Sequence, residues 1–421
     1  MTVCRSPLSR SLLGVKRTCP FALHMSAYDP KRTFSICDIR IYWLRVGAVS
    51  LCDREEEERV MVGTAITKHL LSSLPSGAGR SLALATLGVV LVFSNGAAAT
   101  QPSPVTQELI EAAKKEGKVV FYTSTDLQVS EGLTKAFEAK YPGITVRVER
   151  SGAERVMQRI GQEHAANVHA ADAVESTDIV HFLYWKRQGW LAPYVPVDVA
   201  RWPAHARDID GFYATPRATF SVIGYNTTLL KPEDAPKSYA DLLDAKWQGK
   251  IVKAHPAYSG NCITATWVLS HVLGWDYFKQ LGRQRVMQVQ SANDPPKKLA
   301  LGERPVMFDG TEYITLLLKA EGALVAVVYP REGSPLVSGG AAVMKDAPHP
   351  NAARLFISFL FSQEGQQLLV DRGHLRSFHP DIIEPADRTP LPQIKALTVD
   401  PRELEKAIEE IKRKYAEYFG T

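Results

Sequence analysis

Residues 117–160 read GKVVFYTSTDLQVSEGLTKAFEAKYPGITVRVERSGAERVMQRI, and this stretch decides the fold class. The unbroken apolar run at 119–122 is typical of a strand that is buried on both faces of a parallel sheet. Apolar residues then recur three and four positions apart over 133–141, which predicts a helix, and Pro142-Gly143 ends it. A second strand with alternating polarity is expected at 144–148. The stretch therefore predicts a strand-helix-strand unit of an α/β protein.

The same alternation of strands and helices continues through two long stretches of the chain, which are separated near residue 225. Further strands are expected at 171–180, 219–225, 249–253, 285–289, 305–308, 324–329 and 340–344. Apolar side chains on one face of 404–415 predict a terminal helix that packs on the fold. The sequence thus predicts two α/β lobes.

The net charge of +5 belongs to the first part of the chain. Residues 1–99 contain 12 Lys and Arg against 7 Asp and Glu, and the remaining residues contain 38 of each kind. The remainder of the chain is therefore formally neutral. A protein that binds nucleic acid needs a basic surface for the phosphate backbone, so we expect no nucleic-acid partner.

Residues 61–99 have the features of a secretory signal peptide. Met61 is followed by Lys68 and Arg80, then by the apolar run SLALATLGVVLVF at 81–93 and the small residues Ala97-Ala98-Ala99. The apolar run is too short for a typical membrane-spanning helix. A signal peptide should begin near the start of a chain, so we interpret residues 1–60 as a start-site artefact, with a genuine cytoplasmic extension as the alternative.

Cys262 is the only cysteine after residue 60, so no intramolecular disulfide is expected in the exported part. It lies near a predicted helix start, where a thiol pKa can fall. An enzyme that uses Cys262 as its nucleophile is therefore one alternative, and a buried cysteine that packs as a small apolar residue is the other. The exported part contains no G-x-S-x-G, H-E-x-x-H, Walker or G-x-G-x-x-G motif.

Candidate ligand-binding residues follow the predicted strands, where open α/β sheets bind their ligands. Hydroxyls and free N–H groups at helix starts suit an anionic group, although the same residues could simply cap turns. The candidates in the first stretch are Thr123, Ser124, Thr125, Ser151, Gly152, Glu175 and Ser176. Those in the second stretch are Tyr258, Ser259, Gly260, Thr311 and Tyr313.

Four segments carry a resemblance to a known family. GKVVFYTST at 117–125, IGYNTTLL at 223–230, YPREGS at 329–334 and HPNAARLFISFLFSQEGQQLL at 349–369 resemble bacterial extracellular solute-binding proteins of ABC transporters. The branch that they resemble contains ferric-ion and sugar-phosphate binders. The resemblance implies a type II periplasmic-binding-protein fold, with two lobes, an interlobe cleft and hinge closure.

On this resemblance, lobe 1 comprises residues 100–222 and 335–421, and lobe 2 comprises residues 223–334. The crossover strands would be 219–225 and 340–344. Arg217 and Arg331 flank them and could pair with a carboxylate or phosphate, or be structural.

The resemblance also bears on the ligand. In the ferric binders the region around 309–313 supplies two adjacent tyrosines to iron, whereas this chain has Glu312-Tyr313. A phenolate with a carboxylate still suits a hard cation, so ferric ion remains the alternative and the metal ligands remain unassigned. We expect a small anionic organic solute and no cofactor.

The expected function is that of a soluble, monomeric periplasmic receptor, which delivers its solute to a membrane permease. The alternatives are a receptor that reports to a membrane sensor and the enzyme that uses Cys262.

Overall fold

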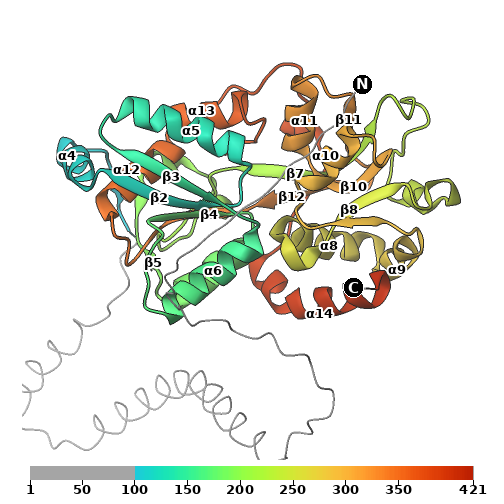
Figure 1. Ribbon diagram of the computed structural model, residues 1–421, viewed down its shortest axis with the longest axis horizontal. Coiled ribbons are helices and arrows are strands. Elements are labelled where there is room, and N and C mark those ends of the chain that lie inside the picture. Colours follow the sequence, from blue (N-terminus) through green and yellow to red (C-terminus); the bar gives the residue numbers. More distant parts are fainter. Residues whose placement is uncertain (1–99, 421) are drawn as a thin grey trace, which may run out of the picture. The chain divides into compact units, whose positions relative to one another are not determined.

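The computed structural model describes residues 100–420. The predictions for the signal peptide at 61–99 and for residues 1–60 fall outside the described residues. The described residues belong to one unit that contains two α/β lobes (Figure 1). Within this part of the chain, no helix is both long enough and apolar enough to cross a membrane.

A five-stranded sheet forms the centre of the first lobe. Its strand order is β3-β2-β4-β13-β5, with β2 parallel to β3 and β4, and β13 antiparallel to β4 and β5. The strands are β2 (Lys118–Thr123), β3 (Thr145–Arg150), β4 (Ala173–Ser176), β5 (Leu191–Ala192) and β13 (Gly340–Met344). Strands β1 (Pro102–Ser103) and β6 (Val195–Pro196) form a separate parallel pair.

Helices cover both faces of this sheet. Three of them, α4 (Gln107–Glu116), α5 (Leu127–Lys140) and α12 (Pro350–Phe361), share one apolar core with Val119 and Phe121 of β2. Helices α6 (Ala153–Ala165) and α7 (Ile179–Arg187) share another with Tyr122. Strand β2 is therefore buried on both faces, as its unbroken apolar run predicts.

The second lobe is built on a mixed sheet. Its strand order is β14-β12-β7-β10-β8-β9, and β11 also pairs with β7. The strands are β7 (Ala218–Asn226), β8 (Ile251–Ala254), β9 (Met287–Val289), β10 (Val306–Thr311), β11 (Val325–Val328), β12 (Ser334–Ser338) and β14 (Ala396–Leu397). Its helices are α8 (Gly260–Leu273), α9 (Trp275–Arg283), α10 (Asp294–Ala300) and α11 (Glu312–Ala320). The short 3-10 helices are Val197–Arg201, Ala204–Ala206, Ala240–Leu243, Ala245–Trp247, Pro256–Tyr258 and Leu391–Gln393.

The chain passes between the two sheets at the start of each predicted crossover strand. Strand β7 lies wholly in the second sheet, and the N–H of its first residue, Ala218, donates to the carbonyl of Arg376. Strand β12 lies in the second sheet and β13 in the first, so Gly339 between them carries the return. A Cβ atom at Gly339 would lie 1.7 Å from the carbonyl oxygen of Ser176, which leaves no room for a side chain.

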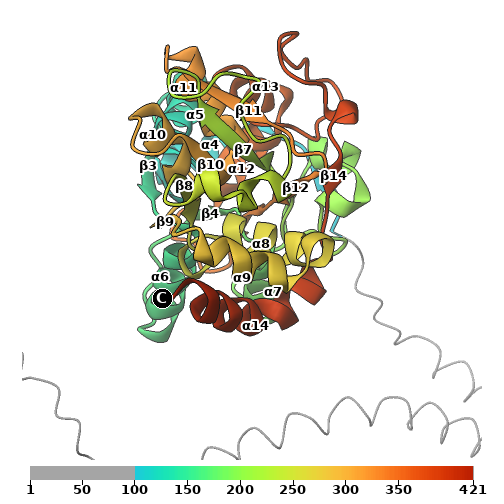
Figure 2. The ribbon, with the colours of Figure 1, turned by 90° about the vertical axis from the view of Figure 1, so that its right-hand side faces the viewer.

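The C-terminal segment differs from the lobe assignment predicted above. After α12 and α13 (Gln363–Asp371), the chain returns to the second sheet, where β14 pairs with β12. Helix α14 (Pro401–Phe419) then packs against α8 and α9, and also contacts α7 of the first lobe (Figure 2). Its apolar face packs on the fold as predicted, because Leu404, Ala407 and Ile411 share a core with Val180 and Ile263. We therefore propose that residues 396–419 belong to the second lobe, and the other predicted boundaries stay proposals.

Candidate ligand-binding cavity between the lobes

A polar cavity lies between the two lobes, at the carboxyl ends of β2, β3 and β4 and beside the start of α8. Six of the predicted site residues line it: Ser124, Gly152, Tyr258, Ser259, Thr311 and Tyr313. Eight further residues also line it: Arg150, Ala153, Thr177, Thr219, Asn261, Ser291, Ala292 and Asn293. The cavity volume is about 20 Å³, room for about one water molecule. A solute of several heavy atoms can therefore enter only if the lobes move apart.

Three helices begin at this cavity without a side-chain cap. The N-cap residues of α6, α10 and α11 are Gly152, Asn293 and Thr311, and none of them accepts a hydrogen bond from its own helix through a side chain. The start of α10 offers no N–H donor to the cavity, because Pro295 and Pro296 have no N–H and the N–H of Asp294 donates to the carbonyl of Ser291. The starts of α6 and α11 bring N–H groups and the positive end of a helix dipole to the cavity from both lobes. Such an arrangement favours an anionic group.

Gly152 also fits closely against the other lobe. A Cβ atom at this position would lie 3.1 Å from the carbonyl oxygen of Tyr258, which is tight for a carbon-oxygen contact. A glycine therefore lets the start of α6 approach the second lobe without a side chain in between.

Polar side chains complete the lining. Among the residues that the structure describes, Arg150 at the end of β3 is the only charged residue of the lining, and its Nη2 lies 3.4 Å from Ser291 Oγ in the second lobe. Asn261 is 2% exposed, and neither its amide nitrogen nor its amide oxygen has a hydrogen-bond partner within the structure. A buried amide without partners costs free energy, so it marks a place where a ligand could bind.

Tyr313 is held as a neutral phenol. Its hydroxyl accepts a hydrogen bond of 2.7 Å from Asn293 Nδ2, and Asn293 Oδ1 accepts one of 3.1 Å from Thr311 Oγ1. Burial raises the pKa of Tyr313 to about 12, although the nearby charge of Arg217 acts to lower it. At neutral pH this side chain can donate a hydrogen bond to a ligand but carries no charge.

Glu175 lies beneath the cavity and holds the loop after β2. Its Oε2 accepts hydrogen bonds from Thr123 Oγ1 (2.6 Å) and Thr125 Oγ1 (3.0 Å), and from the N–H groups of Ser124 and Thr125 (3.2 Å each). Its Oε1 lies 2.7 Å from Nη2 of the buried Arg217. Thr123, Thr125 and Glu175 were predicted to face the ligand, whereas their polar groups bind one another and do not line the cavity.

The other three predicted residues also lie outside the lining. The hydroxyl of Ser176 lies 3.3 Å from His181 Nδ1 and accepts a hydrogen bond from the N–H of Asp178. Gly260 packs directly against Asp178, so it forms part of the contact between the lobes. Ser151 donates its N–H to the carbonyl of Thr123, which continues the pairing of β2 with β3.

Glu312 is not available to a cation in the cavity. Its carboxylate is fully buried, pairs with Arg376 at 2.7 Å and Arg388 at 3.1 Å, and accepts the hydroxyl of Tyr329 at 2.6 Å. Burial acts to raise the pKa of Glu312, but the hydrogen bonds and charges of the two arginines outweigh it, and the net pKa is lowered. Within the described part of the chain, the cavity lining contains no carboxylate and no histidine.

Cys262 is buried behind the cavity rather than exposed to it. Its Sγ lies 3.0 Å from Lys253 Nζ and 3.1 Å from Asp309 Oδ2, and Lys253 and Asp309 form a buried ion pair of 2.7 Å. Burial raises the pKa of the Cys262 thiol to about 12, and the charge of Asp309 acts in the same direction. The thiol is therefore protonated and inaccessible, so the alternative of an enzyme that uses it receives no support.

The loop at 291–293 carried a signal that the sequence analysis did not use. The sequence Ser291-Ala292-Asn293-Asp294-Pro295-Pro296 places an Asn and prolines at the beginning of a helix, which is a common start signature. This loop follows the carboxyl end of β9, so the rule that ligands bind after strand ends would have made it a candidate as well.

Known proteins share this architecture. The structure resembles that of the periplasmic binding protein AfuA from Actinobacillus pleuropneumoniae with exogenous fructose-6-phosphate bound, at a TM-score of 0.66 and 24% identity over 72% of this chain and 99% of that one. It also resembles iron-bound HitA from Pseudomonas aeruginosa, at a TM-score of 0.62 and 21% identity over 71% of this chain and 99% of the other. At these identities the likeness shows the fold alone.

Sequence comparisons give two further matches. Iron uptake protein A1 from Synechocystis sp. is 24% identical over 70% of this chain and 84% of its own length. Residues 132–396 match the family described as bacterial extracellular solute-binding protein.

Proposed function

Because the chain belongs to the family of bacterial extracellular solute-binding proteins, we propose that it captures a small anionic organic solute between its lobes and delivers it to the permease of an ABC importer. It would act in the periplasm as a monomer without a cofactor. A phosphate or carboxylate group of the solute would lie at the starts of α6 and α11, and Arg150 would supply a countercharge. Uptake of the solute can be measured in a strain that lacks the protein. Loss of uptake would support the importer receptor, whereas normal uptake would support a receptor that reports to a membrane sensor.

The observation that carries this proposal is the chemistry of the cavity lining. The two helix starts of α6 and α11, one arginine and the unpaired amide of Asn261 offer hydrogen-bond donors. Of the nearby carboxylates, Glu175 and Glu312 are already neutralised by buried arginines, and Asp126 pairs with Lys297. The carboxylate of Asp294 accepts the N–H of Ser291. The lining thus suits an anion better than a cation. The likeness to AfuA, whose structure contains a sugar phosphate, is in keeping with this choice.

Binding would require the lobes to open and then close on the solute. Polar contacts join them around the cavity: Lys297 lies 3.3 Å from Asp126, Arg155 Nη2 lies 2.6 Å from Gln290 Oε1, and Gln128 Nε2 lies 3.0 Å from Glu321 Oε1. Apart from the half-buried Asp126, these side chains are exposed, so their contacts are weak and can break when the lobes separate. A solute that contacts both lobes stabilises the closed arrangement, because it gains its full set of contacts only there.

Ferric ion is the second candidate. It is favoured by the relative named iron uptake protein A1 and by two tyrosines in the lining, Tyr258 and Tyr313. Iron would have to displace the proton of Tyr313, whose pKa is raised to about 12, and the lining offers no carboxylate to join it. We therefore prefer the organic anion.

The test is a calorimetric titration of the purified protein with fructose 6-phosphate, inorganic phosphate, citrate and ferric nitrilotriacetate. We expect at least one organic anion to bind, and Arg150→Gln to weaken it. Arg147→Gln is the matched control, because Arg147 is an exposed arginine of the same strand, paired with Glu149 outside the cavity. A tyrosinate-to-iron absorption band that Tyr313→Phe abolishes, without binding of any organic anion, would overturn the proposal in favour of iron.

A further inference from the structure

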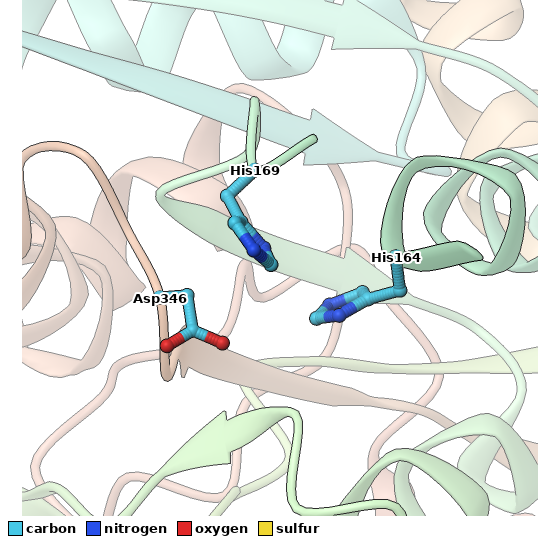
Figure 3. Close-up of side chains that lie close together, drawn as sticks. All are labelled: His164, His169 and Asp346. Atoms are coloured by element: carbon cyan, nitrogen blue, oxygen red, sulfur yellow. The ribbon is translucent and has the colours of Figure 1, made fainter. Parts of the chain in front are cut away.

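Two histidines and an aspartate gather on the first lobe, far from the solute cavity. Figure 3 shows the rings of His164 and His169 close to the side chain of Asp346. One ligand atom from each lies within 4.8 Å of those of the other two, and the ring centroids of the histidines are 5.0 Å apart. Helix α6 starts at the cavity, and His164 lies in its last turn, roughly 17 Å further along the helix.

The end of α6 brings the two histidines together. Asn167 has a positive φ of 54°, the N–H of Val168 donates to the carbonyl of Glu163, and the N–H of Asn167 donates to that of His164. These bonds form the turn that often ends a helix with a left-handed residue, for which asparagine is suited. The chain reverses there, so His169 returns beside His164 although five positions separate them.

Trp190 connects the histidines to Asp346. Its ring stacks on that of His164, with the centroids 4.1 Å apart and the planes inclined by 4°. Its carbonyl accepts the N–H of Lys345, the residue before Asp346, at 2.9 Å. One residue thus orients a histidine ring and anchors the segment that carries the aspartate.

We propose that His164, His169 and Asp346 bind a divalent transition metal ion of the zinc class, with water as the remaining ligand. Imidazole nitrogens and a carboxylate are common ligands of such ions, and a site with three protein ligands leaves a position for water. In a tetrahedral zinc site, neighbouring ligand atoms lie about 3.3 Å apart. Asp346 is exposed and lies two residues after the end of β13, so a small movement of its side chain can bring its carboxylate within reach.

Glu163, which lines the same small hollow, is not part of the proposed ligand set. Its carboxylate already accepts hydrogen bonds from Tyr122 at 2.7 Å and Arg159 at 2.9 Å. A bound ion would instead tie the end of α6 to the end of β13, two elements whose opposite ends lie at the interlobe region. The metal would therefore stabilise the first lobe without contacting the solute.

The test is a calorimetric titration of the full chain with zinc ion, after accessible thiols have been blocked with iodoacetamide so that they do not compete. We expect one equivalent to bind, and zinc to raise the midpoint of thermal unfolding. His164→Gln, His169→Gln and Asp346→Asn should each weaken this binding at least about tenfold, since even residues that only support metal ligands contribute that much. Cobalt ion provides a second readout, through the visible absorption of a tetrahedral complex.

His271→Gln is the matched control, because His271 is an exposed histidine outside the cluster, on α8. It should bind zinc as the wild type does. Asp346→Asn changes an exposed side chain, so it tests the site even if a histidine variant fails to fold. Equal zinc binding by the wild type and all three cluster variants, or no binding by the wild type, would overturn the proposal.

Discussion

Glu175→Gln is the substitution for which the structure makes the sharpest prediction. Glu175 is 3% exposed and pairs at 2.7 Å with Arg217, which is 4% exposed. Nε of Arg217 has no hydrogen-bond partner within the structure, so the guanidinium depends on this carboxylate as its counterion. Glutamine keeps the shape and one acceptor oxygen for Thr123 and Thr125, but it removes the charge.

The expected loss follows from the burial of the pair. Removing one partner of a buried ion pair leaves the other charge unpaired in a medium of low dielectric constant, which costs about 3–5 kcal/mol of unfolding free energy. The pair of Lys140 and Glu364 has the same charges but is about half exposed, with side chains 42% and 48% exposed. Such surface pairs contribute about 0–1 kcal/mol. Glu364→Gln is therefore the matched control.

Urea denaturation followed by circular dichroism measures both variants against the wild type. Glu175→Gln should lower the unfolding free energy by several times as much as Glu364→Gln does. The double variant Glu175→Gln, Arg217→Met should be more stable than Glu175→Gln alone, because it removes the uncompensated charge as well. If Glu175→Gln costs no more than the surface control, the account of Glu175 as the countercharge of Arg217 is wrong.

Three further predictions concern the cavity, the return between the sheets and the acid limb of stability. Arg150→Gln should weaken binding of the organic anion about 10- to 100-fold, because it removes a charged hydrogen bond. Calorimetry measures this loss with Arg147→Gln as the control, and an equal loss of affinity in both variants would contradict the prediction. Gly339→Ala should strongly lower the midpoint of thermal unfolding, because the new Cβ would lie 1.7 Å from the carbonyl oxygen of Ser176. Gly132→Ala is the control and should leave the midpoint unchanged, because its Cβ would meet nothing within 4 Å. Similar midpoints for the two variants would refute the prediction. Glu312 has a lowered pKa, so its contribution to stability is present above the ordinary value of 4.5 and is lost as the pH falls through the lowered pKa. The stability difference between wild type and Glu312→Gln, measured in urea, should therefore be largest near neutral pH and shrink below about pH 4.5, and a constant difference would argue against the linkage.

Periodicity in the sequence predicts the fold well where local pattern and burial agree. The apolar run at 119–122 became a strand buried on both faces, and the helix expected over 133–141 ends where Pro142 and Gly143 require it. The position of the C-terminal helix was not predictable in this way. An apolar face on 404–415 predicts that the helix packs against something, but its periodicity does not say which lobe provides the surface.

The same distinction applies to the cavity. The rule that ligands bind after the carboxyl ends of strands selected Ser124, Gly152 and Tyr258, which line it. It could not distinguish them from Thr123 and Thr125, because the partner that engages these two, Glu175, lies 50 or more positions along the chain. Arg150 was missed because it is the last residue of a strand, where a charged side chain is usually just solvated.

Helix α14 determines what kind of movement the two lobes can make. It joins α7 of one lobe to α8 of the other through Leu404, Ala407 and Ile411, and Glu405 pairs with Arg187 on α7. The chain itself joins the lobes at residues 214–218, at Gly339 and between α13 and β14, and α14 adds a further attachment. Lobes that are held by several attachments resist any movement that would pull one of the attachments apart. The contacts of α14 should therefore restrict the opening that we propose, and release of α14 from α7 should permit wider movements, which would change how the Arg150 and Asn261 sides of the cavity face each other.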